Sequence, residues 1–151
     1  MNCRAGLLAA LLLPACLGAE AEASRAVREY DDALVRAYGR NDAALLAGLA
    51  TPKEQARVQV LVDLKAGAKL ALEARLESFD VASAKASGDG AVVETTERWR
   101  YHDRSLAPGR PDGPDFDSDM RMRYALVRDG GRWKVDAVST VSAKPAAIPP
   151  R

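Results

Sequence analysis

The residue best placed to do chemistry is Glu97, a carboxylate in a segment where apolar and polar side chains alternate. Because successive side chains of a strand point to opposite faces, Glu97 shares one face of a predicted strand with Val93, Thr95, Trp99 and Tyr101. A carboxyl group buried on that face needs a pairing partner, or else its pKa rises. In a pocket, such a group could act as a general acid or base.

Aromatic residues could line a ligand pocket around Glu97. Tyr30, Tyr101 or Tyr124 could supply a phenol beside its carboxyl group. The candidate catalytic residues are therefore Glu97, Tyr101 and Tyr124, and the candidate pocket consists of Glu97, Trp99, Tyr101, Tyr124 and Trp133. The alternative is that aromatic residues at strand spacing only form the core, and that Glu97 pairs with a basic helix residue near the sheet rim. The sequence does not show whether these side chains converge, so no catalytic role is assigned.

The opposite face of the same predicted sheet is basic. One interpretation is a docking surface for an acidic partner, such as a protein, a lipid headgroup or an anionic glycan. The other is an ordinary solvated sheet face. A homodimer through this face is a further alternative, although like charges would then meet. The residues of this predicted partner surface are Arg98, Arg100, Arg121, Arg123 and Lys134, with His102 at the strand end.

No residue pattern predicts a metal site or a cofactor. His102 is the single histidine, and the two cysteines, Cys3 and Cys16, lie near the N-terminus, so a transition-metal ligand set is missing. Acidic residues alternate at positions 115, 117 and 119 as in a calcium loop, but Met120 stands where that motif needs glycine. We expect a solvated loop here.

The N-terminal segment, residues 1–23, has the layout of a secretory signal peptide: Arg4, an apolar run over 5–13, and then small residues. The run is too short to span a bilayer, which takes about 20 residues. Residues 13–16, Leu-Pro-Ala-Cys, resemble the lipobox of bacterial lipoproteins, which predicts lipidation of Cys16. Ordinary cleavage at the small-residue sites 19–21 or 21–23 is the alternative. Both predict an exported protein, either periplasmic or tethered to a membrane by its lipid.

The composition is that of one globular domain with enough apolar residues for a core. The chain has 151 residues, of which 48% are hydrophobic, and a net charge of +1 that falls to zero without Arg4. A near-neutral domain lacks the basic excess typical of nucleic-acid binding, so we expect no nucleic-acid partner. We place the domain at residues 24–141 and a loose, proline-rich tail at 142–151.

Hydrophobic periodicity predicts three helices followed by four antiparallel strands, which is an α+β domain with helices on one sheet face. Ser24 is expected to cap the first helix, Asn41 or Asp42 the second, and Thr51 the third. In the third helix, Val58, Leu61 and Leu64 are expected to face inward. The helices are predicted over 24–40, 41–49 and 51–67, the strands over 70–81, 91–101, 119–128 and 132–141, a bulge near 77–78, and a long loop over 103–118.

The C-terminal hairpin carries a resemblance to a known family. Residues 124–135, Tyr-Ala-Leu-Val-Arg-Asp-Gly-Gly-Arg-Trp-Lys-Val, resemble the closing strand, glycine turn and Trp-Lys-Val strand of the nuclear transport factor 2-like superfamily. The resemblance implies a cone-like fold with three helices on a curved four-stranded sheet. That superfamily holds enzymes, such as ketosteroid isomerase and polyketide cyclase relatives, and non-catalytic binding domains, so the fold alone does not settle the function.

Two functions follow from these observations. The first is an exported, non-catalytic envelope protein that acts as a binding or protein-interaction module, because no catalytic constellation is evident. The alternative is a small-molecule-binding or isomerase- or cyclase-like enzyme that uses the pocket around Glu97, Trp99 and Tyr124. The expected partner is accordingly an envelope protein or a small apolar ligand.

Overall fold

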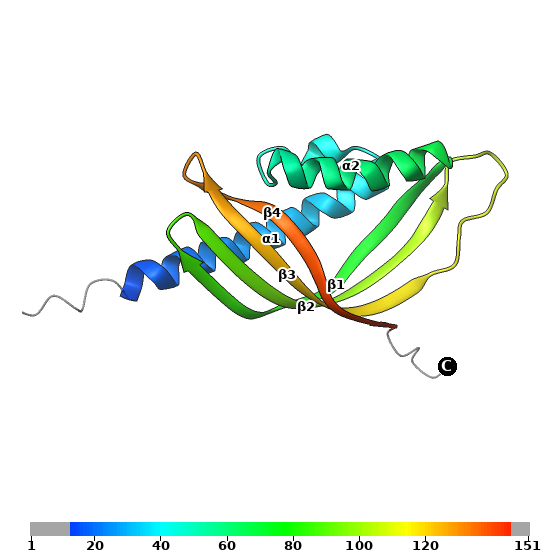
Figure 1. Cartoon of the computed structure of the whole chain (residues 1–151). Helices are drawn as coiled ribbons and strands as arrows, with labels where there is room; N and C mark the ends of the chain where they lie inside the picture. The colour runs from blue at the N-terminus through cyan, green and yellow to red at the C-terminus, as the bar shows by residue number, and fades with distance from the viewer. Residues whose placement is uncertain (1–12, 146–151) are drawn as a thin grey trace, which may run out of the picture.

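Residues 13–145 fold as two α-helices, one 3₁₀ turn and one four-stranded antiparallel sheet in the order β1-β2-β3-β4 (Figure 1). The computed structural model describes the backbone of residues 13–145 and the side chains of residues 18–145. The elements are α1 (Leu13–Arg40), η1 (Ala43–Leu46), α2 (Pro52–Gly67), β1 (Leu70–Ser87), β2 (Gly90–Ser105), β3 (Phe116–Asp129) and β4 (Arg132–Pro145). The predicted α+β class and the antiparallel sheet are confirmed.

The prediction of three helices is wrong, because residues 41–49 form only the short 3₁₀ turn η1. Asp42 does cap this turn, since its side chain accepts a hydrogen bond from the Ala44 amide at 3.0 Å. The turn cannot grow into an α-helix because Gly48, at φ 82°, leaves the helical region. The chain beyond it then hydrogen-bonds to β4, where Val135 donates to the Leu49 carbonyl at 2.9 Å.

Helix α1 begins well before Ser24, so the predicted N-cap at that residue is wrong. The Ser24 hydroxyl instead donates to the Glu20 carbonyl one turn earlier, at 2.9 Å. Ala23 is fully buried, and Ala19 packs against the same core. Part of the segment expected to be removed on export therefore contributes to the packing of the domain. Residues 1–12 and the side chain of Cys16 lie outside the described parts of the chain.

Helix α2 begins as predicted, with Thr51 as its N-cap and Pro52 in its first turn. The Thr51 hydroxyl accepts from the Glu54 amide at 3.4 Å, but the Glu54 side chain turns into the interior instead of reaching back to Thr51. The expectation that Leu64 faces inward is wrong, since it is 68% exposed while Val58 and Val62 are buried. These two valines, four residues apart, define the inner face of the helix.

The strands are longer than predicted, and bulges bend the sheet around the helices. β2 continues to Ser105 and β3 starts at Phe116, so the loop between them covers 106–115 only. The predicted bulge of β1 is confirmed by a register shift between Leu76 and Ser78, and further shifts occur in β1 and between β3 and β4. Bulges increase twist and bend a strand, and the sheet in Figure 1 curves accordingly, with α1 and α2 on its concave side.

The prediction of a loose tail from residue 142 is wrong over 142–145, because these residues belong to β4. Residues 146–151 lie outside the described residues.

The core lies between the helices and the concave face of the sheet. It includes Val27 and Tyr30 of α1, Leu46 of η1, and Tyr124 and Val135 of the sheet, each at most 1% exposed. Within residues 13–145, none of the helices combines the length and the apolar character needed to cross a membrane.

Two leucines, one buried in the core and one exposed to solvent, provide a test of this packing. Leu46→Ala should lower the free energy of unfolding by about 2–5 kcal/mol, because the fully buried side chain leaves a cavity. Leu64→Ala, the matched control on the exposed face of α2, should stay within about 0.5 kcal/mol of wild type. Urea denaturation followed by circular dichroism measures both. Equal losses for the two variants would contradict the arrangement.

Candidate functional site

A cavity of about 280 Å³ lies between α1, α2 and the concave face of the sheet. All four strands contribute side chains to it, and most of these are apolar or aromatic. The polar groups belong mainly to the end of the cavity where α1 meets β2 and β3. The lining consists of Tyr30, Asp31, Leu34, Tyr38, Arg57, Leu61, Leu72, Ala74, Glu97, Trp99, Tyr101, Met120, Met122, Tyr124, Val138 and Thr140.

Glu97 is buried at this end of the cavity, with 1% of its surface exposed. Alternation along β2 brings Thr95 and Trp99 to the same face, and both donate to its carboxylate, the Trp99 indole at 2.6 Å. The Tyr124 hydroxyl donates to Glu97 Oε1 at 2.8 Å from β3. The alternative that Glu97 lies at the sheet rim and pairs with a basic side chain is therefore wrong, since Glu97 is buried and accepts hydrogen bonds from three neutral donors.

A second buried carboxyl group, Asp31, lies opposite Glu97 on α1 and is fully buried. Its two oxygens lie 3.1 and 3.3 Å from the Tyr124 hydroxyl. Burial, and then the nearby Glu97 carboxylate, hold the pKa of Asp31 well above its usual range. Asp31 was not among the site residues predicted from the sequence. The available signal was a carboxylate on the apolar helix face that also carries Val27, Leu34 and Tyr38.

Tyr124 joins the two carboxyl groups and ties α1 to the sheet. Burial, followed by the charges of Asp31 and Glu97, raises the pKa of its phenol, so the hydroxyl keeps its proton. A phenol has one proton to donate. The shorter bond directs that proton to Glu97, so Asp31 can hydrogen-bond to the Tyr124 oxygen only by donating a proton of its own. The chain of hydrogen bonds runs from Asp31 through Tyr124 to Glu97.

A separate buried network borders the cavity on the α2 side. Glu54 is 1% exposed and accepts a hydrogen bond from the Tyr30 hydroxyl at 2.5 Å. The Arg57 guanidinium binds the same carboxylate through two nitrogens, at 2.6 and 2.8 Å. Burial and the bond to Glu54 raise the pKa of the Tyr30 phenol. The charge of Arg57 at the cavity wall is therefore already balanced by Glu54.

The structure brings four of the five predicted pocket residues together. Glu97, Trp99, Tyr101 and Tyr124 line the cavity, and Tyr101 also stacks on Phe116 with ring centres 5.9 Å apart. Trp133 does not line it, so its inclusion in the pocket is a wrong prediction. The β4 residues that line the cavity are Val138 and Thr140, farther along the strand. Trp133 instead lies under the Arg128 guanidinium, 4.3 Å from its ring centre.

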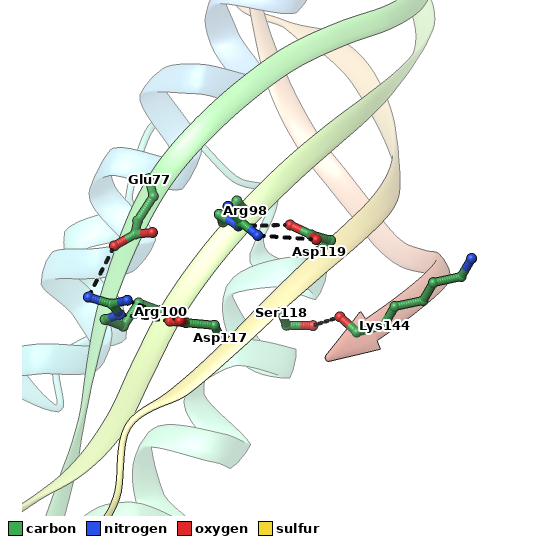
Figure 2. A network of polar contacts seen from close by, with 7 residues as sticks. All are labelled: Glu77, Arg98, Arg100, Asp117, Ser118, Asp119 and Lys144. Atoms are coloured by element: carbon green, nitrogen blue, oxygen red, sulfur yellow. Dashed lines mark hydrogen bonds and ion pairs between the residues drawn. The ribbon is translucent and has the colours of Figure 1, made fainter. Parts of the chain in front are cut away.

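The predicted basic surface on the other sheet face consists of ion pairs between neighbouring strands. Figure 2 shows Arg98 against Asp119 and Arg100 between Asp117 and Glu77. Its remaining members pair in the same way: Arg121 and Arg123 with Glu94, and Lys134 with Asp129. Because each cation has a carboxylate within 4.0 Å, the surface has mixed charge. Docking of an acidic partner here stays a prediction.

The acidic residues of the 112–119 segment are engaged with protein groups. Asp115 lies 3.0 Å from the His102 imidazole, and Asp112 accepts from the Ser105 amide at 2.7 Å. Asp117 and Asp119 belong to the ion pairs with arginine, and the bond from Arg100 holds the pKa of Asp117 below its usual range. Among residues 18–145, no three His, Cys, Asp or Glu side chains are grouped to hold a metal ion.

The comparisons with known proteins give the fold. No protein-family model and no curated protein matches the sequence. Among solved structures, the intermembrane space region of the chloroplast protein ARC6 superposes with a TM-score of 0.71 at 18% identity, over 80% of this chain and 95% of that one. A candidate dehydratase of the NTF2-like family from Streptomyces avermitilis gives 0.53 at 16% identity over 85% and 99%. A ketosteroid isomerase-like protein from Erwinia carotovora atroseptica gives 0.51 at 14% identity over 82% and 96%. The chain therefore has the nuclear transport factor 2-like fold.

The elevated pKa of Asp31 predicts the pH dependence of stability. The folded protein holds a proton on Asp31 that the unfolded chain releases near pH 3.8, so stability falls as the pH rises above that value. Asp31→Asn should therefore raise the free energy of unfolding by roughly 1–3 kcal/mol at pH 8, and the gain should shrink towards pH 4.

Thermal unfolding between pH 4 and 8 measures this effect, with Asp32→Asn as the matched control. Asp32 is half-exposed and paired with Arg28 at 3.4 Å, so its change should stay within about 0.5 kcal/mol. A gain for Asp31→Asn that is the same at every pH would show that its carboxyl group does not titrate as described.

Proposed function

We propose that this protein is a binding module that holds a small, mainly apolar molecule in the cavity between the helices and the sheet. The cavity itself carries the proposal. Its volume of about 280 Å³, its aromatic and aliphatic walls, and the few polar groups at one end are the usual properties of a small-molecule site. The fold supports the same function, because its cone leaves space beneath the helices.

The state of Glu97 supports binding over catalysis. A general base needs a lone pair directed at the substrate proton, whereas Glu97 already accepts from Thr95, Trp99 and Tyr124. Tyr101, the other candidate catalytic residue, packs on Phe116. An isomerase- or cyclase-like enzyme remains the alternative function. It would have to use Asp31, whose carboxyl group has a single hydrogen-bonding partner among the described residues, Tyr124.

Export with a lipid on Cys16 is the second part of the proposal. Cleavage before Cys16 leaves α1 from residue 16 onward, whereas cleavage after residue 21 or 23 would remove Ala19, which packs against the core. The later cut would also remove Glu22, which pairs with Arg128 at 3.5 Å, and the buried Ala23. Retention of these contacts supports the lipobox over the small-residue cleavage sites.

A blocked cavity tests the binding function. Thr140 is exposed at the edge of the cavity, so Thr140→Trp should fill its mouth without disturbing the core. Ser139→Trp, on the adjacent exposed residue outside the lining, is the matched control. Native mass spectrometry of protein purified gently from its own host should show an added small-molecule mass on wild type and on the control, and none on Thr140→Trp.

The same variants can be compared by thermal shift with a panel of single-ring apolar compounds. At least one compound should stabilise wild type and the control while leaving Thr140→Trp unchanged. Absence of both an added mass and any stabilisation in wild type would refute the binding function.

The lipid tether has its own test. Mature protein from the native host should have a mass that starts at Cys16 and includes covalently attached acyl chains, and should fractionate with membranes. Cys16→Ser should abolish the acyl mass and release the protein from the membrane fraction, because the acyl chains on Cys16 are the proposed attachment. Mature wild type that begins after residue 21 or 23 would contradict the tether but not the cavity function.

A further inference from the structure

The two buried carboxyl groups of the cavity, Asp31 and Glu97, are not held by ion pairs in the part of the chain that the structure describes. Asp31 is fully buried and Glu97 is 1% exposed. Neither forms an ion pair with any Lys, Arg or His side chain among residues 18–145. Other carboxylates of that region form thirteen such pairs, those of Glu22, Asp32, Glu54, Glu73, Glu77, Glu94, Asp103, Asp115, Asp117, Asp119, Asp129 and Asp136. Buried charge is ordinarily paired, because its separation from water costs several kcal/mol.

Counting donors shows which carboxyl group is incomplete. Glu97 receives three hydrogen bonds, and the single Tyr124 proton is one of them. Among the described residues, Asp31 has Tyr124 as its single hydrogen-bonding partner, to which one of its oxygens can donate a proton. Its other oxygen then accepts no hydrogen bond from the described residues, although Asp31 lines the cavity. A buried acceptor without a donor is rare in folded proteins.

The walls around Asp31 are suited to a positive charge. Tyr30, Tyr38, Trp99, Tyr101 and Tyr124 all line the cavity, and the faces of aromatic rings attract cations. Arg57 is the cationic side chain among the described lining residues. Its guanidinium is bound by Glu54 through two nitrogens, so this pair adds no net charge that would repel a cation.

We infer that the ligand is a small organic ammonium ion whose N–H groups bind Asp31 at the polar end of the cavity. The inference rests on the proposed binding function and names its ligand class. A volume of about 280 Å³ is at the lower limit of ligand sites, roughly 300 Å³, so the cation carries one ring or a short alkyl chain. The aromatic side chains enclose its apolar part.

On binding, the ammonium ion takes the place of the proton on the Asp31 carboxyl group. The neutral Asp31 carboxyl group loses its proton to solvent, and the ammonium ion forms an ion pair with the resulting carboxylate. Tyr124 then keeps its bond to Glu97 and the ligand supplies the donor that Asp31 lacks. Affinity should therefore rise with pH until the amine itself deprotonates. The charged and titratable groups near Asp31 are Arg28, Asp32 and Tyr38 on α1, Glu54 and Arg57 on α2, Glu97 on β2 and Tyr124 on β3, whereas β1 and β4 present Leu72, Ala74, Val138 and Thr140.

The test compares benzylammonium with benzyl alcohol, two probes of similar size that both donate a hydrogen bond and differ in charge. Isothermal titration calorimetry on the wild-type domain at pH 7 should give at least about tenfold tighter binding of benzylammonium. Titrations in buffers of different ionisation enthalpy should show that protons are released on binding, as the raised pKa of Asp31 predicts. Asp31→Asn should abolish both the preference and the proton release, while Asp32→Asn should retain both.

The outcomes separate this inference from the proposed function. Equal affinity for the two probes, or a preference that survives in Asp31→Asn, would overturn the ammonium ligand and leave the apolar binding function intact. Failure of both probes to bind would also overturn it. In that case the added mass and the effect of Thr140→Trp decide the binding function independently.

Discussion

Two carboxyl groups, Asp31 and Glu97, are buried where α1 crosses the sheet, and the interior is arranged to make that burial tolerable. Glu97 is satisfied by a hydroxyl, an indole and a phenol from β2 and β3. Asp31 is satisfied only in part, through the same phenol, and its pKa rises because of burial and the nearby Glu97. Tyr124 is therefore the residue through which the helix layer and the sheet layer are held in register, since loss of its hydroxyl would leave both carboxyl groups short of a partner.

The cavity exists because the sheet bends away from the helices while polar networks keep the helices in place. Register shifts along β1 and between β3 and β4 provide the bend. Glu54 fixes α2 to α1 through the Tyr30 hydroxyl and orients Arg57. Close packing would otherwise fill such a space. One network borders the cavity at α2, and the other joins α1 to β2 and β3.

The outer face of the sheet follows a different principle from the inner one. Its arginines pair with carboxylates on the next strand, as in Arg98 with Asp119 and Arg100 with Asp117. Exposed pairs contribute little to stability, but charged side chains on a sheet discourage association with other sheets. The arginines of the outer face are thus balanced by carboxylates, whereas Asp31 and Glu97 inside are held by hydrogen bonds without an ion pair among the described residues.

The sequence by itself determined the α+β class, the antiparallel order of the strands, the first β1 bulge, and the face that carries Glu97, Trp99, Tyr101 and Tyr124. These features depend on local periodicity, turn chemistry and capping, which act between residues near one another in the chain. The fold resemblance read from the last hairpin was also correct. The long-range features were decided by tertiary structure: the side chain that faces Glu97 is Asp31 on α1, Glu54 turns inward to Tyr30, and Trp133 packs in the core away from the cavity. Residues 41–49 form only a turn because the chain leaves the helical region at Gly48, after which the Leu49 carbonyl accepts a hydrogen bond from Val135 of β4. Each of these outcomes depends on a contact between distant segments, and no local pattern encodes which distant partner a buried polar group will find.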